Sequence, residues 1–260
     1  WSDWHPINFT LEMPPFLPDG AANGIVRFYL KQVRPVLQLY VSPINIDPLD
    51  PGAQTISEPE GFVTEIAADI GRFYTTGFQE DHKALPNGVF DDAQYLEQAR
   101  MVLRERFALM EHAFSNYDDG LLFFYYSSTD LQAHMFWWRG DDPHPTRTPE
   151  MAKKYNSVIE ELYIEMDAVV GKIIDDYDDL ATIIVMSDHG FSNSGRHFNV
   201  NTWLRDNGYL MPASAKSFAQ VDWSQTTAYG LGLNGFYLNL KGRERDGIVI
   251  EAERGAVLEE

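Results

Sequence analysis

Two continuous apolar runs organise the pattern of hydrophobic and polar positions. Leu121 to Tyr126 and Thr182 to Met186 are apolar without alternation, which is typical of parallel strands buried on both faces. Between them, residues 149–177 place apolar side chains at helical spacing and predict a long helix. Strand, helix and strand in this order predict a βαβ unit with parallel strands and a right-handed crossover.

The pattern around this unit predicts further helices and antiparallel β-structure. Helical spacing recurs in three segments, 57–71, 92–114 and 200–207. Short β-type runs, of which the first two predict a hairpin, cover 24–31, 35–41, 226–229 and 235–240. Prolines and polar residues predict irregular structure over 1–21, 42–60 and 139–149.

These elements predict one α/β domain over residues 1–260. Its mainly parallel sheet is flanked by helices, and a small antiparallel β element lies near the N-terminus. Within the domain, residues 1–55 form a β-rich lobe or insertion, and residues 56–260 form the α/β core that carries the candidate chemistry. A chain of 260 residues with 44% hydrophobic content is long enough to bury a sizeable core.

Charge and cysteine content narrow the partners. The 20 basic and 39 acidic side chains give a net charge of −19, which repels phosphate backbones and argues against a nucleic-acid partner. The absence of cysteine excludes disulfides, thiolate zinc sites and cysteine nucleophiles. No apolar run reaches the roughly 20 residues of a membrane helix. The compartment stays open, with a lean towards the cytoplasm, and so does the oligomeric state.

Each predicted strand of the βαβ unit ends in an acid with a histidine nearby. In open α/β sheets, ligands gather outside the carboxyl ends of the strands. Asp130 and His134 are four residues apart, so one helical turn places them on one side. Asp188 and His189 are adjacent, and the glycine after them lets both face one cavity. His197 follows in a polar loop and is a weaker candidate.

Carboxylate and imidazole groups together suit zinc, manganese or iron better than calcium or magnesium. The five groups are many for one tetrahedral ion and few for two, and two ions about 3.5–4 Å apart are the usual clamp for a phosphoryl group. A lone Asp–His pair is more often a salt bridge or a surface hydrogen bond. Two such pairs at the ends of two strands of one unit strengthen the metal hypothesis.

Four segments of the sequence resemble motifs of a known superfamily. STDLQAH (128–134) and IIVMSDHGF (183–191) resemble the metal-binding motifs of the alkaline phosphatase superfamily. HFNVNTWLRDNGYL (197–210) and LNLKGRERDGIV (238–249) resemble one branch of the type I phosphodiesterase/nucleotide pyrophosphatase family, the predicted phosphohydrolases or phosphomutases. The resemblance covers most of the chain and implies an alkaline-phosphatase-like core with two divalent metal ions, zinc being favoured over manganese.

The resemblance also implies a ligand set. Asp130, His134 and a third histidine, for which His197 is the choice, would hold one ion. Asp188 and His189 would join an earlier aspartate and a Ser or Thr nucleophile around the other. The family's first motif, a strand ending in that aspartate, is not found in the chain. The nucleophile is therefore expected upstream of residue 1, and the chain is expected to be a piece of a longer protein with little turnover alone.

The function implied by the resemblance is hydrolysis of a small-molecule phosphate ester by a metal-dependent phosphodiesterase or nucleotide pyrophosphatase. Three alternatives stay open. The intact protein could be a phosphomutase or phosphoryl transferase, or a sulfatase-like hydrolase. The chain could also be a catalytically inactive binding module that keeps the fold.

Overall fold

The computed structural model describes residues 1–11, 20–137, 148–193, 195–233 and 235–259. The chain divides into two compact units, Trp1–Asn193 and Ser194–Glu260, which are described separately below. Most of the loop predicted over 139–149 lies outside the described residues. Among the described helices, none combines the length and the apolar character needed to cross a membrane. The predicted division at residue 55 stays a prediction.

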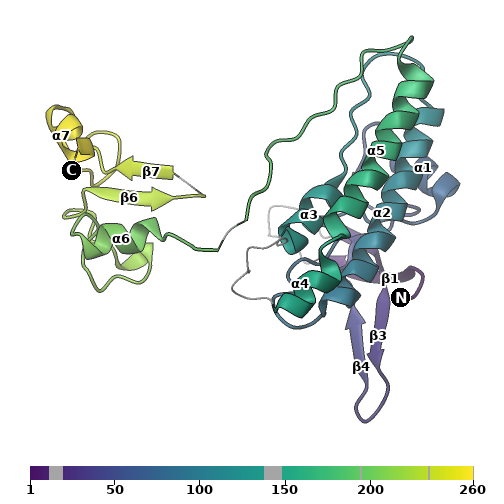
Figure 1. Ribbon diagram of the computed structural model, residues 1–260, viewed down its shortest axis with the longest axis horizontal. Coiled ribbons are helices and arrows are strands. Elements are labelled where there is room, and N and C mark those ends of the chain that lie inside the picture. The colour runs from purple at the N-terminus through teal and green to yellow at the C-terminus, as the bar shows by residue number, and fades with distance from the viewer. Residues whose placement is uncertain (12–19, 138–147, 194, 234, 260) are drawn as a thin grey trace. The chain divides into compact units, whose positions relative to one another are not determined.

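The first unit begins with antiparallel β-structure. Three strands pair in the order β1–β2–β5, with bounds β1 His5–Leu11, β2 Gly20–Val26 and β5 Asn45–Ile46. β3 (Phe28–Gln32) and β4 (Gln38–Val41) form a separate hairpin that projects from the sheet (Figure 1). The predicted hairpin is thus confirmed, with a later start because its first residues belong to β2. Irregular structure over 1–21 was a wrong prediction for β1, since pairing with β2 satisfies its backbone.

Five helices follow in the described residues of the first unit. Their bounds are α1 Phe62–Ile70, α2 Asp92–Ser115, α3 Ser127–Phe136, α4 Pro149–Tyr155 and α5 Val158–Tyr177. α2 begins at a capping box, in which Gln94 N donates to the Asp91 carboxylate and Asp91 N donates to the Gln94 side chain. The single helix predicted over 149–177 is interrupted at Asn156 and Ser157, whose short polar side chains compete for backbone hydrogen bonds.

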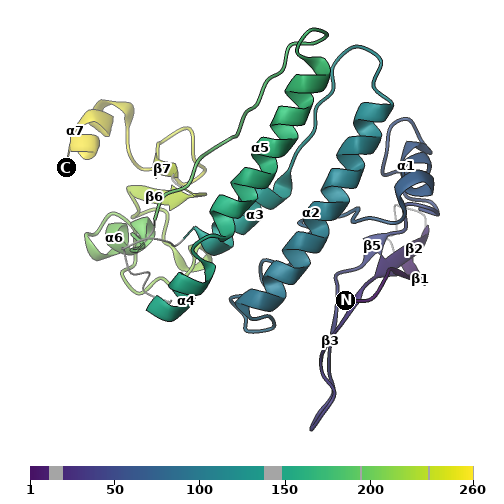
Figure 2. The ribbon, with the colours of Figure 1, turned by 45° about the vertical axis from the view of Figure 1, so that its right-hand side comes forward.

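The core of the first unit lies where α3 meets α2 and α5. α3 contacts both neighbours, and Figure 2 shows it between them. Tyr95 of α2 and Phe136 of α3 are fully buried, with ring centroids 5.9 Å apart. The Tyr95 hydroxyl also donates to the Leu131 carbonyl oxygen at 3.3 Å. These contacts fix α3, which will carry two residues of the candidate site.

The parallel strand pair predicted from the two apolar runs is not present in the described residues. Residues 121–126 and 182–186 run extended, and no backbone–backbone hydrogen bond links 121–125 or 182–186 to another segment of the described chain. Many of their large side chains face solvent: Leu121 is 92% exposed and Ile184 is 76% exposed. In the first run exposed positions alternate with partly buried ones, so at most one face is covered. A strand buried on both faces needs neighbours that cover it, and no described segment supplies them.

Both extended segments start from the same end of the helical layer. Residues 117–126 lead away from the C-terminal end of α2, and residues 178–193 lead away from the C-terminal end of α5 (Figures 1 and 2). Each returns along the layer from that end. The first segment enters α3 directly, whereas the second stays extended through the candidate metal ligands.

The second unit is small and built around one hairpin. Its elements are α6 Val200–Asp206, η1 Phe218–Gln220, β6 Ala228–Leu231, β7 Gly235–Leu238, η2 Glu251–Glu253 and α7 Arg254–Glu259. α6 is capped by the Asn199 side chain, which accepts from Thr202 N at 2.9 Å. Leu204, Ala228 and Leu238 form its buried centre. The predicted helix over 200–207 and both β-type runs are confirmed.

Candidate metal site

α3 carries the first two residues of the candidate site. Asp130 lies in the first turn of the helix and His134 lies one turn later. Ser128 and Leu131 of the same helix are buried, so the inner face of α3 is fixed by packing. His134 Nε2 lies 3.4 Å from Asp130 Oδ1. The spacing of four residues thus places both groups together, as the sequence predicts.

His189 reaches the same carboxylate from the second extended segment. Its Nε2 atom lies 3.5 Å from Asp130 Oδ1. Its other ring nitrogen, Nδ1, lies 3.0 Å from the carbonyl oxygen of Gly190. Because a carbonyl only accepts, this contact assigns the ring proton to Nδ1 and leaves the Nε2 lone pair free. A backbone carbonyl that orients the ring in this way is common behind metal-binding histidines.

The three groups meet at one point. One ligand atom from each of Asp130, His134 and His189 lies within 4.8 Å of the other two. Asp130 Oδ1 is buried and has no hydrogen-bond partner among the described residues. The histidine side chains are about half exposed, at 51% for His134 and 47% for His189. A buried carboxylate oxygen that lacks a hydrogen bond and faces two imidazoles fits a divalent cation with one open side.

Phe191 forms an apolar wall beside the two imidazoles. Its ring centroid lies 4.9 Å from that of His134 and 5.2 Å from that of His189. It also contacts Trp137, with ring centroids 5.4 Å apart. The sequence reasoning did not single out Phe191. The signal that could have found it is a large aromatic residue two positions after a candidate ligand.

Asp188 and His197, the other two predicted ligands, are not among the converging groups and stay predictions. Asp188 Oδ2 lies 3.8 Å from His189 Nε2, but the Asp188 side chain is 83% exposed and is not one of the three converging groups. His197 is exposed and belongs to the second unit. The structure therefore brings together three of the five predicted ligands and leaves the roles of Asp188 and His197 untested.

Two further ionisable groups lie near the three ligands. Glu80 is fully buried, and burial raises the pKa of its carboxyl to about 7. The pKa of the Tyr125 phenol is raised by partial burial and by the negative charges of Asp130 and Asp188. The site is thus acidic on the side where a cation would be bound.

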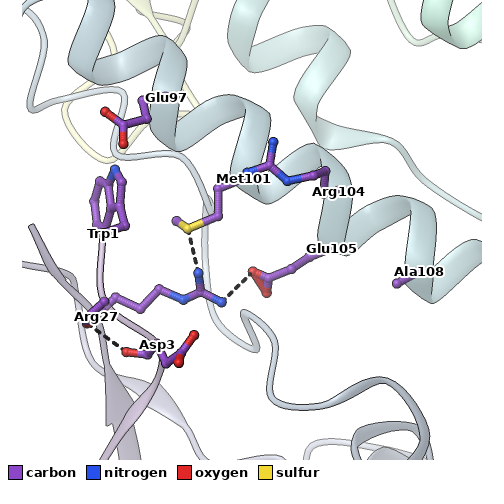
Figure 3. Close-up of a pocket in the computed structure, with 9 residues that line it drawn as sticks. Trp1, Asp3, Arg27, Glu97, Met101, Arg104, Glu105 and Ala108 are labelled. Atoms are coloured by element: carbon purple, nitrogen blue, oxygen red, sulfur yellow. Dashed lines mark hydrogen bonds and ion pairs between the residues drawn. The ribbon is translucent and has the colours of Figure 1, made fainter.

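A separate cavity of about 480 Å³ lies between the N-terminal segment and α2 (Figure 3). Arg27 points into it, 3.5 Å from Glu105 and in contact with Met101. Burial raises the pKa of the Glu105 carboxyl to about 7. None of the three converging ligands lines this cavity. Arg27 faces Glu105, and Asp3 and Glu97 also line the cavity, so it does not present a net positive surface for a phosphate.

An acid and two imidazoles that converge on one open point define a candidate centre for a divalent cation. A protein-family comparison identifies the family of the chain. The family model for type I phosphodiesterase/nucleotide pyrophosphatase matches residues 66–260, and the chain belongs to this family of the alkaline phosphatase superfamily. The resemblance stated from the motifs is confirmed. Comparison with curated proteins and with solved structures gave no match.

Membership of the family indicates a general class of reaction. Its members are generally hydrolytic enzymes and typically depend on divalent metals, and small phosphate esters fit as substrates. The candidate group of Asp130, His134 and His189 lies within the matched residues.

Proposed function

We propose that this protein is a metal-dependent phosphoric-ester hydrolase of the phosphodiesterase/nucleotide pyrophosphatase type. In this proposal Asp130, His134 and His189 hold a divalent cation. The observation that carries it is the buried Oδ1 of Asp130, which has no hydrogen bond among the described residues and faces two imidazole nitrogens at 3.4 Å and 3.5 Å. Unpaired buried polar atoms are uncommon in proteins and call for a partner.

The donor set supports zinc over manganese, because two imidazoles and one carboxylate are common zinc ligands. A bound divalent cation would polarise a phosphoryl oxygen and favour the ionised form of a water or hydroxyl nucleophile. The protein side chains would orient the cation and shield it on one side with Phe191. Since the chain carries a net charge of −19, a cation in the site is also what would let an anionic ester approach.

We further propose a second cation beside the first. Asp188 and His189 would contribute to it, and His197 would join Asp130 and His134. Only the Nε2 lone pair of His189 is free, so His189 would bind one of the two ions and not both. This atom lies 3.5 Å from Asp130 Oδ1 and 3.8 Å from Asp188 Oδ2. The expectation that a Ser or Thr nucleophile lies upstream of residue 1 stays a prediction.

The proposal extends to the fold. We propose that residues 121–126 and 182–186 are strands of a parallel sheet in the functional enzyme, as in an alkaline-phosphatase-like core. Their support is the row of exposed apolar side chains, which burial in a sheet would remove from water at about 25 cal/mol per Å². Deuterium exchange that slows at these residues in the active form would support this proposal, and fast exchange in an active form would contradict it.

Metal titration tests the proposed site directly. Zinc and manganese are titrated by calorimetry into the metal-free protein, and bound metal is counted by mass spectrometry. We expect tight zinc binding by the wild-type protein and a loss of more than about tenfold in Asp130→Ala and His189→Ala. His82→Ala is the matched control, because His82 lies outside the site. Unchanged zinc affinity in Asp130→Ala would contradict the proposal.

Hydrolysis distinguishes the enzyme from the alternatives. Bis(p-nitrophenyl) phosphate and p-nitrophenyl phosphate report diesterase and monoesterase activity, and both should require added zinc or manganese. Because the chain is expected to show little turnover without a nucleophile from upstream of residue 1, this assay uses the longer protein. Zinc binding by that protein without release of nitrophenol from either compound would favour the inactive binding module. Phosphoryl transfer to an added alcohol in preference to water would favour the phosphoryl transferase.

A further inference from the structure

Glu80 is a fully buried carboxyl beside the helix that carries Asp130 and His134. Its side chain is 0% exposed, and neither carboxyl oxygen has a hydrogen-bond partner among the described residues. Burying such a group without a partner destabilises the folded state. A carboxyl in this position therefore needs a reason other than general stability.

The backbone around Glu80 is held between α2 and α3. Ser127 Oγ donates to Gln79 Oε1 at 2.9 Å, which ties the residue before Glu80 to the first turn of α3. The Asp81 N–H donates to Gln98 Oε1 at 2.9 Å, which ties the residue after Glu80 to α2. With both neighbours fixed, the Glu80 side chain has little freedom to leave the buried space between the two helices.

One polar group that acts on Glu80 lies on the inner face of α3. The Ser128 hydroxyl is close enough to Glu80 to favour its ionised form, and the charges of Arg106 and Asp130 also act on it. Ser128 is 0% exposed, and its Oγ atom has no hydrogen-bond partner among the described residues. Gln132, four residues on and so on the same face, has a buried Nε2 that is likewise unpaired within the described chain.

A donor and an acceptor thus lie close together at the start of α3. The Ser128 hydroxyl can donate, and the Glu80 carboxyl can accept. A small side-chain rotation would close this hydrogen bond and fix the first turn of the helix. Ser128 is two residues before Asp130, so the orientation of this turn sets where Asp130 Oδ1 points.

We propose that Glu80 is a positioning residue that acts through Ser128 to hold Asp130 in place for cation binding. The proposal rests on the proposed function, since it assumes that Asp130 is a metal ligand. Glu80 itself does not contact the cation. The support is its complete burial, the unpaired groups on α3 and the anchoring of its neighbours to both helices.

Zinc affinity tests the proposal without relying on turnover. Calorimetry compares Glu80→Met, which keeps the volume and removes the polar group, with Glu80→Gln, which keeps an acceptor oxygen. We expect about 10- to 100-fold weaker zinc binding for Glu80→Met and a change within about threefold for Glu80→Gln. Circular dichroism confirms that each variant is folded at the temperature used.

Glu105→Met is the matched control. Glu105 is a mostly buried acid on α2, with its side chain 17% exposed, but it lies beside Arg27 and does not contact α3 through any described hydrogen bond. Its substitution should leave zinc affinity within about threefold of wild type. An equal loss in Glu105→Met would show that any buried acid matters in the same way and would overturn the positioning role.

Other outcomes separate this proposal from the one it rests on. Unchanged affinity in Glu80→Met, or no recovery in Glu80→Gln, overturns the role of Glu80 while a loss in Asp130→Ala still supports the metal site. No zinc binding by the wild-type protein overturns both. If Glu80→Met does not fold, Ser128→Ala takes its place: about tenfold weaker binding supports the proposal, and unchanged binding overturns it.

Discussion

The two halves of the candidate site are supported in different ways. Asp130 and His134 stand on α3, whose inner face is packed against α2 and α5. His189 stands on an extended segment whose preceding residues, Val185 and Met186, are mostly exposed. One half is therefore fixed by the core, whereas the other depends on contacts that begin only at the site itself.

This difference has consequences for metal binding. A segment with few buried contacts opens at a low free energy, while a packed helix opens only near global unfolding. A cation bound by all three residues would have to order the segment, and that ordering would reduce the observed affinity. The helix would supply a preorganised pair of ligands, and the segment would supply the ligand that responds to the cation.

The largest expected difference is in how much two phenylalanines contribute to the free energy of unfolding. Phe136 on α3 is 1% exposed and Phe123 in the first extended segment is 74% exposed. We expect Phe136→Ala to lower the free energy of unfolding by about 3–5 kcal/mol and Phe123→Ala to change it by less than about 0.5 kcal/mol. Urea unfolding followed by circular dichroism measures both. A loss in Phe123→Ala close to that of Phe136→Ala would mean that the extended segment is packed after all.

The packed region should also make stability depend on pH. Burial raises the pKa of Glu105 from 4.5 to about 7, so between these values the folded state binds more protons than the unfolded state. Stability from this group is present at low pH and is lost as the pH rises through 7. We expect the wild-type protein to lose about 3 kcal/mol relative to Glu105→Gln between about pH 5 and pH 8.

Urea unfolding of both proteins at the two pH values measures this difference. The comparison with Glu105→Gln removes the contributions of the other acids, which are common to both proteins. A parallel pH dependence of the two proteins would contradict the burial of Glu105 in α2.

Much of the fold could be predicted from local patterns. The capping box at Asp91, the cap at Asn199 and the stop at Gly71 are determined by nearby residues, and the helix ends at these positions lie close to the predicted ones. The start of α1 was predicted less well, because the helix begins at Phe62 and not at residue 57. Strand pairing was harder, because it depends on a distant neighbour. β1 has a partner that its own pattern does not indicate, and the runs at 121–126 and 182–186 have the expected pattern without a pairing partner in the described chain.

The candidate site also has a part that local spacing predicts and a part that depends on distant neighbours. The spacing of Asp130 and His134 sufficed because one helical turn brings them together. The approach of His189 to Asp130 was expected from the ends of two parallel strands, yet it occurs here without those strands. Glu80 could not be found, because burial of a single acid in a polar connection leaves no periodic signal in the sequence.

Substitution of Phe191 should have the smallest effect of the changes considered. It tests whether the contact between the extended segment and the core supports zinc binding. Its ring is partly buried against the first unit's core and contacts both histidines. An aromatic pair contributes about 0.5–1.5 kcal/mol, so we expect Phe191→Ala to weaken zinc binding by about 2- to 10-fold. Calorimetry measures the affinity.

The control is Phe78→Ala, which removes a comparable ring from His82, at a centroid distance of 5.1 Å and away from the site. It should leave zinc affinity unchanged. If Phe191 anchors the segment, its loss should also speed amide exchange at residues 187–190 in the metal-free protein, while exchange in α3 stays slow. Equal zinc affinity in Phe191→Ala and wild type would mean that His189 is positioned by the Gly190 carbonyl contact and the cation alone, and that the segment needs no apolar anchor.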